Sequence, residues 1–169
     1  MTAIVNAGSR ANPATRGADA KRPRILAVDY GRKRIGLALS DELCLTAQPL
    51  ATVTRTNRQN DLRRLREICR EHGVTRIIVG HPLHMTGEAS PMAHEAARFA
   101  ARLGKETGIR VELADERLTS WEAKRTLAET GASLRQRREP LDHVAAAVLL
   151  RDYLERTREQ AERAAGEED

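Results

Sequence analysis

The chain has 169 residues and a mass of 18.8 kDa, the size of one ordinary domain. It carries 29 Lys and Arg residues against 24 Asp and Glu residues, so an anionic partner is expected. Only 2% of the residues are aromatic, which argues against a sheet that binds single-stranded bases by stacking. Cys44 and Cys69 are expected to be free, buried thiols, and no Cys/His cluster of the kind that binds structural zinc is present.

We predict one folded domain between a basic leader and a charged tail. Residues 1–23 are polar and lack hydrophobic periodicity, as expected of a flexible basic leader. Residues 24–154 hold the predicted domain, and residues 155–169 are expected to be a charged C-terminal tail or a helix extension. No apolar run approaches the roughly 20 residues of a membrane span, and no signal-peptide core is present. A soluble cytoplasmic protein without a membrane partner is therefore expected.

The first predicted elements form a β-hairpin that a third strand extends. Residues 25–28 are a short apolar run that ends at Asp29, and alternating apolar residues resume over 35–39. A third strand over about residues 43–53 would complete an antiparallel meander. Pro49 favours an edge position for this strand, because proline cannot donate a ladder hydrogen bond.

Helices and strands alternate through the rest of the chain. The predicted helices are an amphipathic one over 60–72 with arginines on its outer faces, one from Ser90 to about Thr107 that packs Met92 among others, one over 119–131 and one from about Pro140 onward. The predicted strands lie over 75–79, where Gly80 ends the strand, and over 109–114. Strands that alternate with helices favour right-handed crossovers and parallel neighbours. We therefore expect an α/β fold: a five-stranded mixed sheet, an antiparallel meander followed by parallel strands, with helices on both faces.

Three carboxylates lie at the ends of predicted elements. Asp29 ends a buried strand, Glu116 follows the strand over 109–114, and Asp142 lies in the first turn of the last helix. Because ligands of open α/β sheets bind at the carboxyl ends of strands, we expect the three to converge. Such oxygen ligands suit Mg²⁺ or Mn²⁺, and two such ions could activate water and stabilise the leaving oxygen in phosphodiester hydrolysis.

Each carboxylate also has an ordinary structural explanation. Asp29 could cap the hairpin turn, Glu116 could be a solvated loop residue, and Asp142 could cap a helix, where its charge favours the helix dipole. The sequence alone leaves these alternatives open.

Cations near the carboxylates are candidates for binding phosphate. Arg32, Lys33 and Arg34 lie between Gly31 and Gly36, two glycines that we expect to allow a tight turn. These three cations could bind phosphate oxygens or form an ordinary solvated hairpin tip.

Further arginines lie close to Glu116 and Asp142 in the sequence. Arg117 could orient a phosphate or pair with a carboxylate. Arg135, Arg137 and Arg138 could steer a polyanion toward the acids, although such a run is more often only a solvated surface.

Four segments resemble motifs of the YqgF/RuvX family, in the same order. Residues 29–36 (D-Y-G-R-K-R-I-G) resemble the family's opening D-Y/F/L-G-x-x-x-I-G motif, and residues 80–87 (G-H-P-L-H-M-T-G) are similar to its G-L-P-L-x-M-x-G loop. Residues 115–120 (D-E-R-L-T-S) resemble its D-E-R-L-S/T-S/T segment, and residues 141–146 resemble its helix-opening Asp motif. The resemblance covers about residues 24–154, and four ordered motifs make a chance match very improbable.

The resemblance implies an RNase H-like fold of the Holliday-junction-resolvase type. It also implies a metal-dependent nuclease that processes the 5′ end of pre-16S ribosomal RNA, with Asp29, Glu116 and Asp142 as metal-binding catalytic residues and two Mg²⁺ or Mn²⁺ ions. Two departures from the motifs are His81, where leucine is usual, and His143, where a small or acidic residue is more common. Neither departure removes an expected metal ligand.

Other functions stay open at this level. The same fold could belong to a Holliday junction DNA resolvase, so the expected partner is structured RNA or branched DNA, bound by a monomer or a homodimer. A non-catalytic nucleic-acid-binding factor in transcription or ribosome assembly is a further alternative, although pure binding gains nothing from buried negative charge. An actin-like or sugar-kinase ATPase would need a second such domain, for which the chain has no room.

Overall fold

The computed structural model describes residues 23–84, 86–116 and 142–166. Its elements are β1 (Arg24–Tyr30), β2 (Arg34–Ser40), β3 (Ala47–Thr54), α1 (Arg58–His72), β4 (Val74–His81), α2 (Pro91–Thr107), β5 (Arg110–Asp115) and α4 (Asp142–Gly166). The strand order is β3-β2-β1-β4-β5; β1 and β3 run antiparallel to β2, whereas β4 runs parallel to β1 and β5 runs parallel to β4. The predicted mixed sheet is confirmed, and so is the edge position of the strand that holds Pro49. The predicted helix over 119–131 lies outside the described residues.

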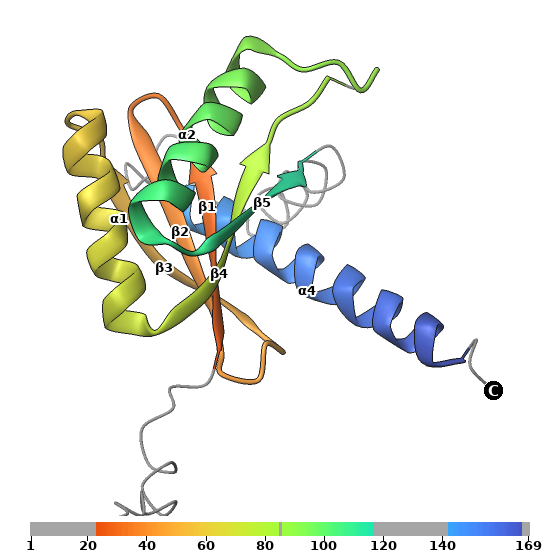
Figure 1. Cartoon of the computed structure of the whole chain (residues 1–169). Helices are drawn as coiled ribbons and strands as arrows, with labels where there is room; N and C mark the ends of the chain where they lie inside the picture. Colours follow the sequence, from red (N-terminus) through yellow and green to blue (C-terminus); the bar gives the residue numbers. More distant parts are fainter. Residues whose placement is uncertain (1–22, 85, 117–141, 167–169) are drawn as a thin grey trace, which may run out of the picture.

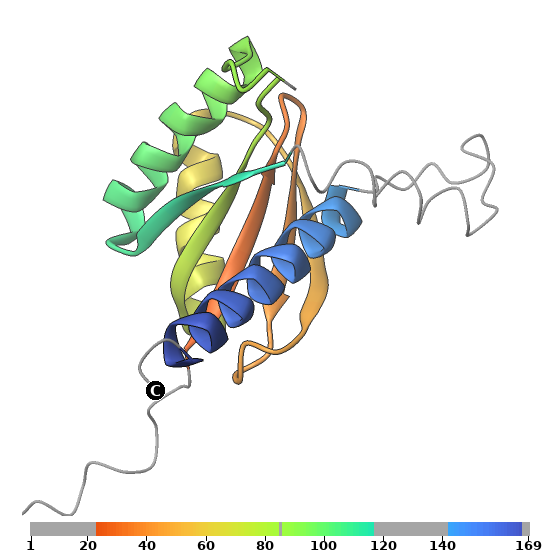
Figure 2. The same ribbon diagram turned by 90° about the vertical axis from the view of Figure 1, so that its right-hand side faces the viewer.

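The sheet has helices on both faces, as predicted (Figures 1 and 2). Leu26 and Val28 of β1 belong to the core that α1 and α2 cover, whereas Ile25 and Ala27 belong to the core under α4. This alternation follows from the pleat, which points successive side chains of a strand to opposite faces. The next residue in the second series, Asp29, therefore lies on the α4 face.

The helix ends follow local capping rules. Asn57 caps α1, so the helix begins at Arg58, two residues earlier than predicted, and Gly73 ends it with a φ of 66°. The predicted cap of α2 is confirmed, because the Ser90 side chain accepts the N–H of Ala93. Met92 was expected in the core but is half-buried; Ala93 is fully buried instead.

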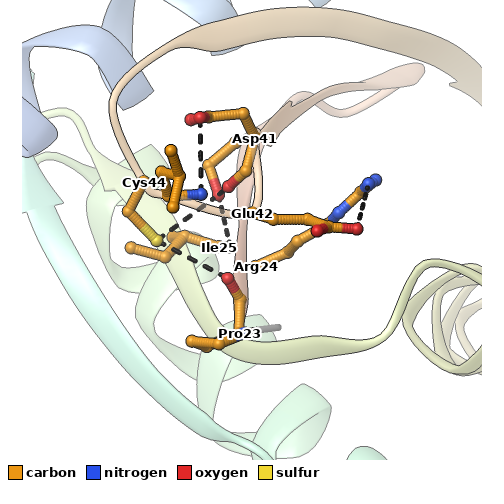
Figure 3. Close-up of polar contacts among 8 residues, drawn as sticks. Pro23, Arg24, Ile25, Asp41, Glu42 and Cys44 are labelled. Carbon is orange, nitrogen blue, oxygen red and sulfur yellow. Dashed lines mark hydrogen bonds and ion pairs between the residues drawn. The ribbon is translucent and has the colours of Figure 1, made fainter. Parts of the chain in front are cut away.

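The loop between β2 and β3 closes the end of the sheet opposite Asp29 (Figure 3). Asp41 accepts the backbone N–H of Leu45 at 2.7 Å, and the Cys44 thiol donates to the Pro23 carbonyl at 3.6 Å. Cys44 adopts a φ of 54°, in the left-handed region. Cys44 and Cys69 are both free, as predicted, but only Cys69 is buried; Cys44 is half-buried in the loop. This end of the sheet is thus tied together by backbone and side-chain contacts.

Helix α4 crosses the sheet and continues past it (Figure 2). Its buried residues include Ala146, Leu149, Leu150 and Leu154, and its 25 residues run on to an exposed, charged last part. In the described part of the chain, no helix combines the length and the apolar character needed to cross a bilayer.

A buried ion pair joins the end of β3 to α1. The Asp61 carboxylate is 3% exposed and accepts hydrogen bonds from Arg55 Nε at 3.1 Å and from the Thr56 N–H at 3.0 Å. Arg55 also donates to the Tyr30 hydroxyl at 2.9 Å and to the Gly31 carbonyl at 3.1 Å. The guanidinium therefore fastens the turn after β1 to the start of α1.

Replacing Asp61 with Ala is expected to lower the free energy of unfolding by about 2 kcal/mol, because it leaves the half-buried Arg55 without its carboxylate. Urea denaturation followed by circular dichroism measures the loss. Glu67→Ala, an exposed position of the same helix, is the matched control and should change stability by less than about 0.5 kcal/mol. Equal small losses in both variants would contradict the structural role of the pair.

Candidate active site

Asp29 has a glycine beside it on each neighbouring strand. It lies opposite Gly36 of β2 in the antiparallel register. On the other side, Val28 pairs with Val79 of β4, so the residue that follows Val79, Gly80, lies next to Asp29. The alternation of both strands places these glycines on the α4 face with the Asp29 side chain. The two sheet positions that flank Asp29 therefore carry no side chain of their own.

The other two predicted acids occupy this space. A Cβ atom on Gly36 would collide with the backbone carbonyl of Asp142, the first residue of α4. A Cβ atom on Gly80 would collide with the carboxylate of Glu116, which directly follows β5. Glu116 and Asp142 thus lie on either side of Asp29, at the carboxyl end of β1.

Gly36 therefore has a structural role other than the predicted one, which was to allow a tight turn. It lies inside β2 without a left-handed backbone, so it does not form the expected tight turn. A glycine is required there because α4 begins directly above it. Gly31 does belong to the turn, where a Cβ atom would collide with the Arg34 carbonyl.

The acids repel one another in a partly buried environment. Burial, and secondly the charge of Asp142, raises the pKa of Asp29 from 3.8 to about 6. Burial raises the pKa of Glu116 from 4.5 to about 7, and the charges of Asp29 and Asp115 add to the shift. A carboxylate cluster of this kind favours the binding of protons or cations.

In EDTA, Asp29 and Glu116 are expected to make the protein less stable as the pH rises from 4 to 7, by about 5 kcal/mol in total. Both pKa values are higher in the folded state, which therefore binds the protons more tightly. The stabilisation is complete below the unfolded pKa, near 4, and is lost as the pH rises through about 6 and 7. Urea denaturation at each pH measures this profile. Asp29→Asn should flatten it, and a variant profile identical to wild type would contradict the coupling.

The carboxylate oxygens of Asp29, Glu116 and Asp142 are donors of the kind that hard divalent cations prefer. Among the described residues, no three His, Cys, Asp or Glu side chains are arranged to hold a single metal ion. The acids form two electrostatically coupled pairs that share Asp29, one with Asp142 and one with Glu116. Oxygen ligands alone suit Mg²⁺ or Mn²⁺, and the two glycines keep the space beside Asp29 free of competing side chains. The chemistry of these donors therefore fits hard divalent cations.

The predicted phosphate-binding cations have separate surroundings. Arg34 Nε donates to Asp142 Oδ2 at 2.8 Å, so this arginine belongs to the acidic site. Arg32 pairs with Glu95 of α2 at 3.0 Å, and Lys33 is exposed. The other predicted cations, Arg117, Arg135, Arg137 and Arg138, lie outside the described residues.

Two features of the site were not predicted from the sequence. Gly80 was expected only to end a strand, yet it makes room for Glu116. His143 Nδ1 lies 3.1 Å from the hydroxyl of Thr52, which pairs with Gly36 across β2 and β3. This contact helps to hold the start of α4 over the sheet. His143 was noticed as a departure from the motif, but the sequence gives no sign of its partner.

Comparison with known protein families matches residues 23–156 to the family described as "RuvX: Holliday junction resolvase". The chain belongs to the RuvX family. Among its curated RuvX relatives, a protein of Anaeromyxobacter sp. (strain K) is 47% identical over 79% of this chain and 97% of its own length. A protein of Koribacter versatilis is 44% identical over 79% of this chain and 87% of its own length. Both carry the name "Putative pre-16S rRNA nuclease".

The RuvX chain also resembles a solved resolvase. The structure of T. thermophilus RuvC in complex with a Holliday junction substrate aligns with a TM-score of 0.50 at 15% identity. The alignment covers 75% of this chain and 89% of the other. This similarity shows the fold, which is RNase H-like, as the family resemblance implied.

Proposed function

We propose that this chain is a metal-dependent nuclease, with Asp29, Glu116 and Asp142 as its catalytic metal ligands. One observation carries the proposal: glycines on both sides of Asp29 admit the other two acids to the same face of the sheet. Gathering carboxylates in a partly buried place costs free energy, and a surface that only bound a polyanion would gain nothing from it. Bound divalent cations would offset this cost, which would explain why the three acids lie together.

The chain's own residues would bind and orient the reacting groups. Bound Mg²⁺ or Mn²⁺ would supply Lewis acidity and lower the pKa of a water molecule. Asp29, which is coupled to both other acids, would contribute to two ions, with Asp142 and Glu116 each completing one side. Arg34, bonded to Asp142, would hold that carboxylate in place and attract phosphate to the site.

The relatives favour precursor ribosomal RNA as the substrate. Curated proteins that are 44 to 47% identical over 79% of this chain are named for pre-16S rRNA. We therefore propose that the enzyme processes the 5′ end of this RNA in ribosome biogenesis, as a cytoplasmic monomer or homodimer. The family description favours a second candidate, cleavage of a four-way DNA junction.

A cleavage assay tests this proposal and separates the two substrates. The purified protein is incubated with end-labelled precursor 16S RNA and with a synthetic four-way DNA junction, each in Mn²⁺ and in EDTA. We expect Mn²⁺-dependent cleavage of the RNA near its mature 5′ end. Symmetric cleavage of the junction alone would favour the resolvase, and no cleavage of either substrate would overturn the nuclease proposal.

A further inference from the structure

A polar hollow lies where the edge strand β3 leads into α1. Its volume is about 520 Å³, and it is lined by Thr54, Thr56, Asn60, Arg63 and Arg64 and by two acids, Asp61 and Glu67. We call it the α1 hollow. None of these residues was among those expected to bind a ligand; Arg63 and Arg64 were assigned only to the solvated side of a helix.

The α1 hollow adjoins the acidic site. Thr54 pairs with Arg34 across β2 and β3, and Arg34 is bonded to Asp142. Thr52, two residues before Thr54 and on the same face of the strand, contacts His143 of α4. A row of polar residues therefore leads from Asp142 through Arg34 to Thr54, at the rim of the hollow.

The charge around the hollow is positive. Residues 54–67 contain five arginines and two acids. The buried Asp61 is neutralised by Arg55, and Arg66 pairs with Glu106 at 2.7 Å. The remaining charges of this segment are three exposed arginines, Arg58, Arg63 and Arg64, and one exposed acid, Glu67. Such a balance favours an anion.

The side chains suit a phosphate group in particular. Arginine presents a planar fork of donors that matches phosphate oxygens, and threonine and asparagine side chains commonly donate to the nucleic-acid backbone. Arg63 donates to Asn60 Oδ1 at 2.9 Å, so these two lining residues are bonded to each other. The start of α1 is already capped by Asn57, so side chains rather than the helix terminus would hold the anion.

We propose that the α1 hollow binds a backbone phosphate of the substrate strand, a few nucleotides from the bond to be cleaved. This inference rests on the proposed nuclease function. β1 and β3 are two strand spacings apart, about 10 Å, and a helical nucleic-acid strand advances about 3.4 Å per nucleotide. A strand that leaves the acids across Arg34 would thus reach Thr54, at the rim of the hollow, within a few nucleotides. The contact positions the strand and reads no base.

Binding measured in EDTA tests the α1 hollow without any cleavage. The probes are a fluorescein-labelled RNA hairpin with single-stranded flanks and a labelled four-way DNA junction, titrated by fluorescence anisotropy at several KCl concentrations. For the type of nucleic acid that the cleavage assay identifies as the substrate, RNA or junction, Arg63→Ala with Arg64→Ala should weaken binding of the probe about tenfold at 0.15 M KCl. The slope of log K against log salt should fall by between one and two.

Two further variants separate a phosphate site from general surface charge. Arg98→Ala with Arg102→Ala removes the same charge from exposed positions of α2, outside the hollow, and should cost less than threefold. Thr54→Val with Thr56→Val changes no charge, and should weaken binding about threefold by removing two donors.

The outcomes distinguish this inference from the proposed function. Wild-type affinity and salt slope for both probes in the Arg63/Arg64 variant would overturn it, as would an equal loss in the Arg98/Arg102 control. If binding depends on Arg63 and Arg64 but the wild-type protein cleaves neither substrate in Mn²⁺, the hollow is a phosphate site and only the nuclease proposal fails.

Discussion

Asp29→Asn is expected to reduce Mn²⁺-dependent cleavage on the order of a thousandfold. The amide removes one negative charge from the residue that is coupled to both other acids, and several kcal/mol of transition-state stabilisation correspond to this factor. The variant should fold normally and be at least as stable as wild type at neutral pH, because it relieves repulsion with Asp142. Single-turnover cleavage of labelled precursor RNA measures the effect.

Asp41→Asn is the matched control for this variant. Asp41 lies in the loop between β2 and β3, at the opposite end of the sheet, and the amide oxygen of asparagine can still accept the loop N–H groups. Its cleavage rate should stay within about twofold of wild type. Wild-type turnover by the Asp29 variant would remove Asp29 from the mechanism.

Gly36→Ala is expected to lower the free energy of unfolding by about 3 kcal/mol and to abolish most of the cleavage activity. The new methyl group would collide with the backbone of Asp142, which cannot move without shifting the start of α4. The same shift displaces the Asp142 carboxylate from Asp29. Thermal and urea denaturation measure the stability, and the cleavage assay measures the activity of the folded fraction.

Gly104→Ala provides the comparison. A Cβ atom at Gly104 meets Val111 only at 3.4 Å, an ordinary contact, and alanine favours a helix over glycine by about 1 kcal/mol. This variant should be as stable as wild type or more stable. If Gly36→Ala behaves in the same way, then the close approach of α4 to β2 does not exist in solution.

Much of the fold follows from local patterns in the sequence. The apolar run that ends at Asp29, the alternation after it, and the caps at Ser90 and Gly73 are short-range signals, and the structure confirms the elements they predict. Asp29 could be selected from the sequence because a carboxylate at the end of a buried strand needs a physical reason. Glu116 and Asp142 were selected by their places at the ends of predicted elements and by the family resemblance. The catalytic role of all three acids stays a prediction.

The remaining features depend on contacts between distant segments. Gly36 and Gly80 resemble ordinary turn and strand-end glycines until the register places them on either side of Asp29. Helical periodicity places Arg63 and Arg64 on a solvated surface. It cannot show that α1 begins beside the end of β3, where Thr54 pairs with Arg34 of the acidic site. Sequence patterns report which face a residue occupies, whereas these sites depend on what lies next to that face.

The most direct test of the account is anomalous diffraction from crystals of the wild-type protein grown in Mn²⁺. We expect Mn²⁺ peaks beside the Asp29 carboxylate, with Asp142 ligating on one side and Glu116 on the other, and the loss of these peaks in Asp29→Asn crystals. Wild-type crystals in which Mn²⁺ binds elsewhere on the protein but not at Asp29 would contradict it.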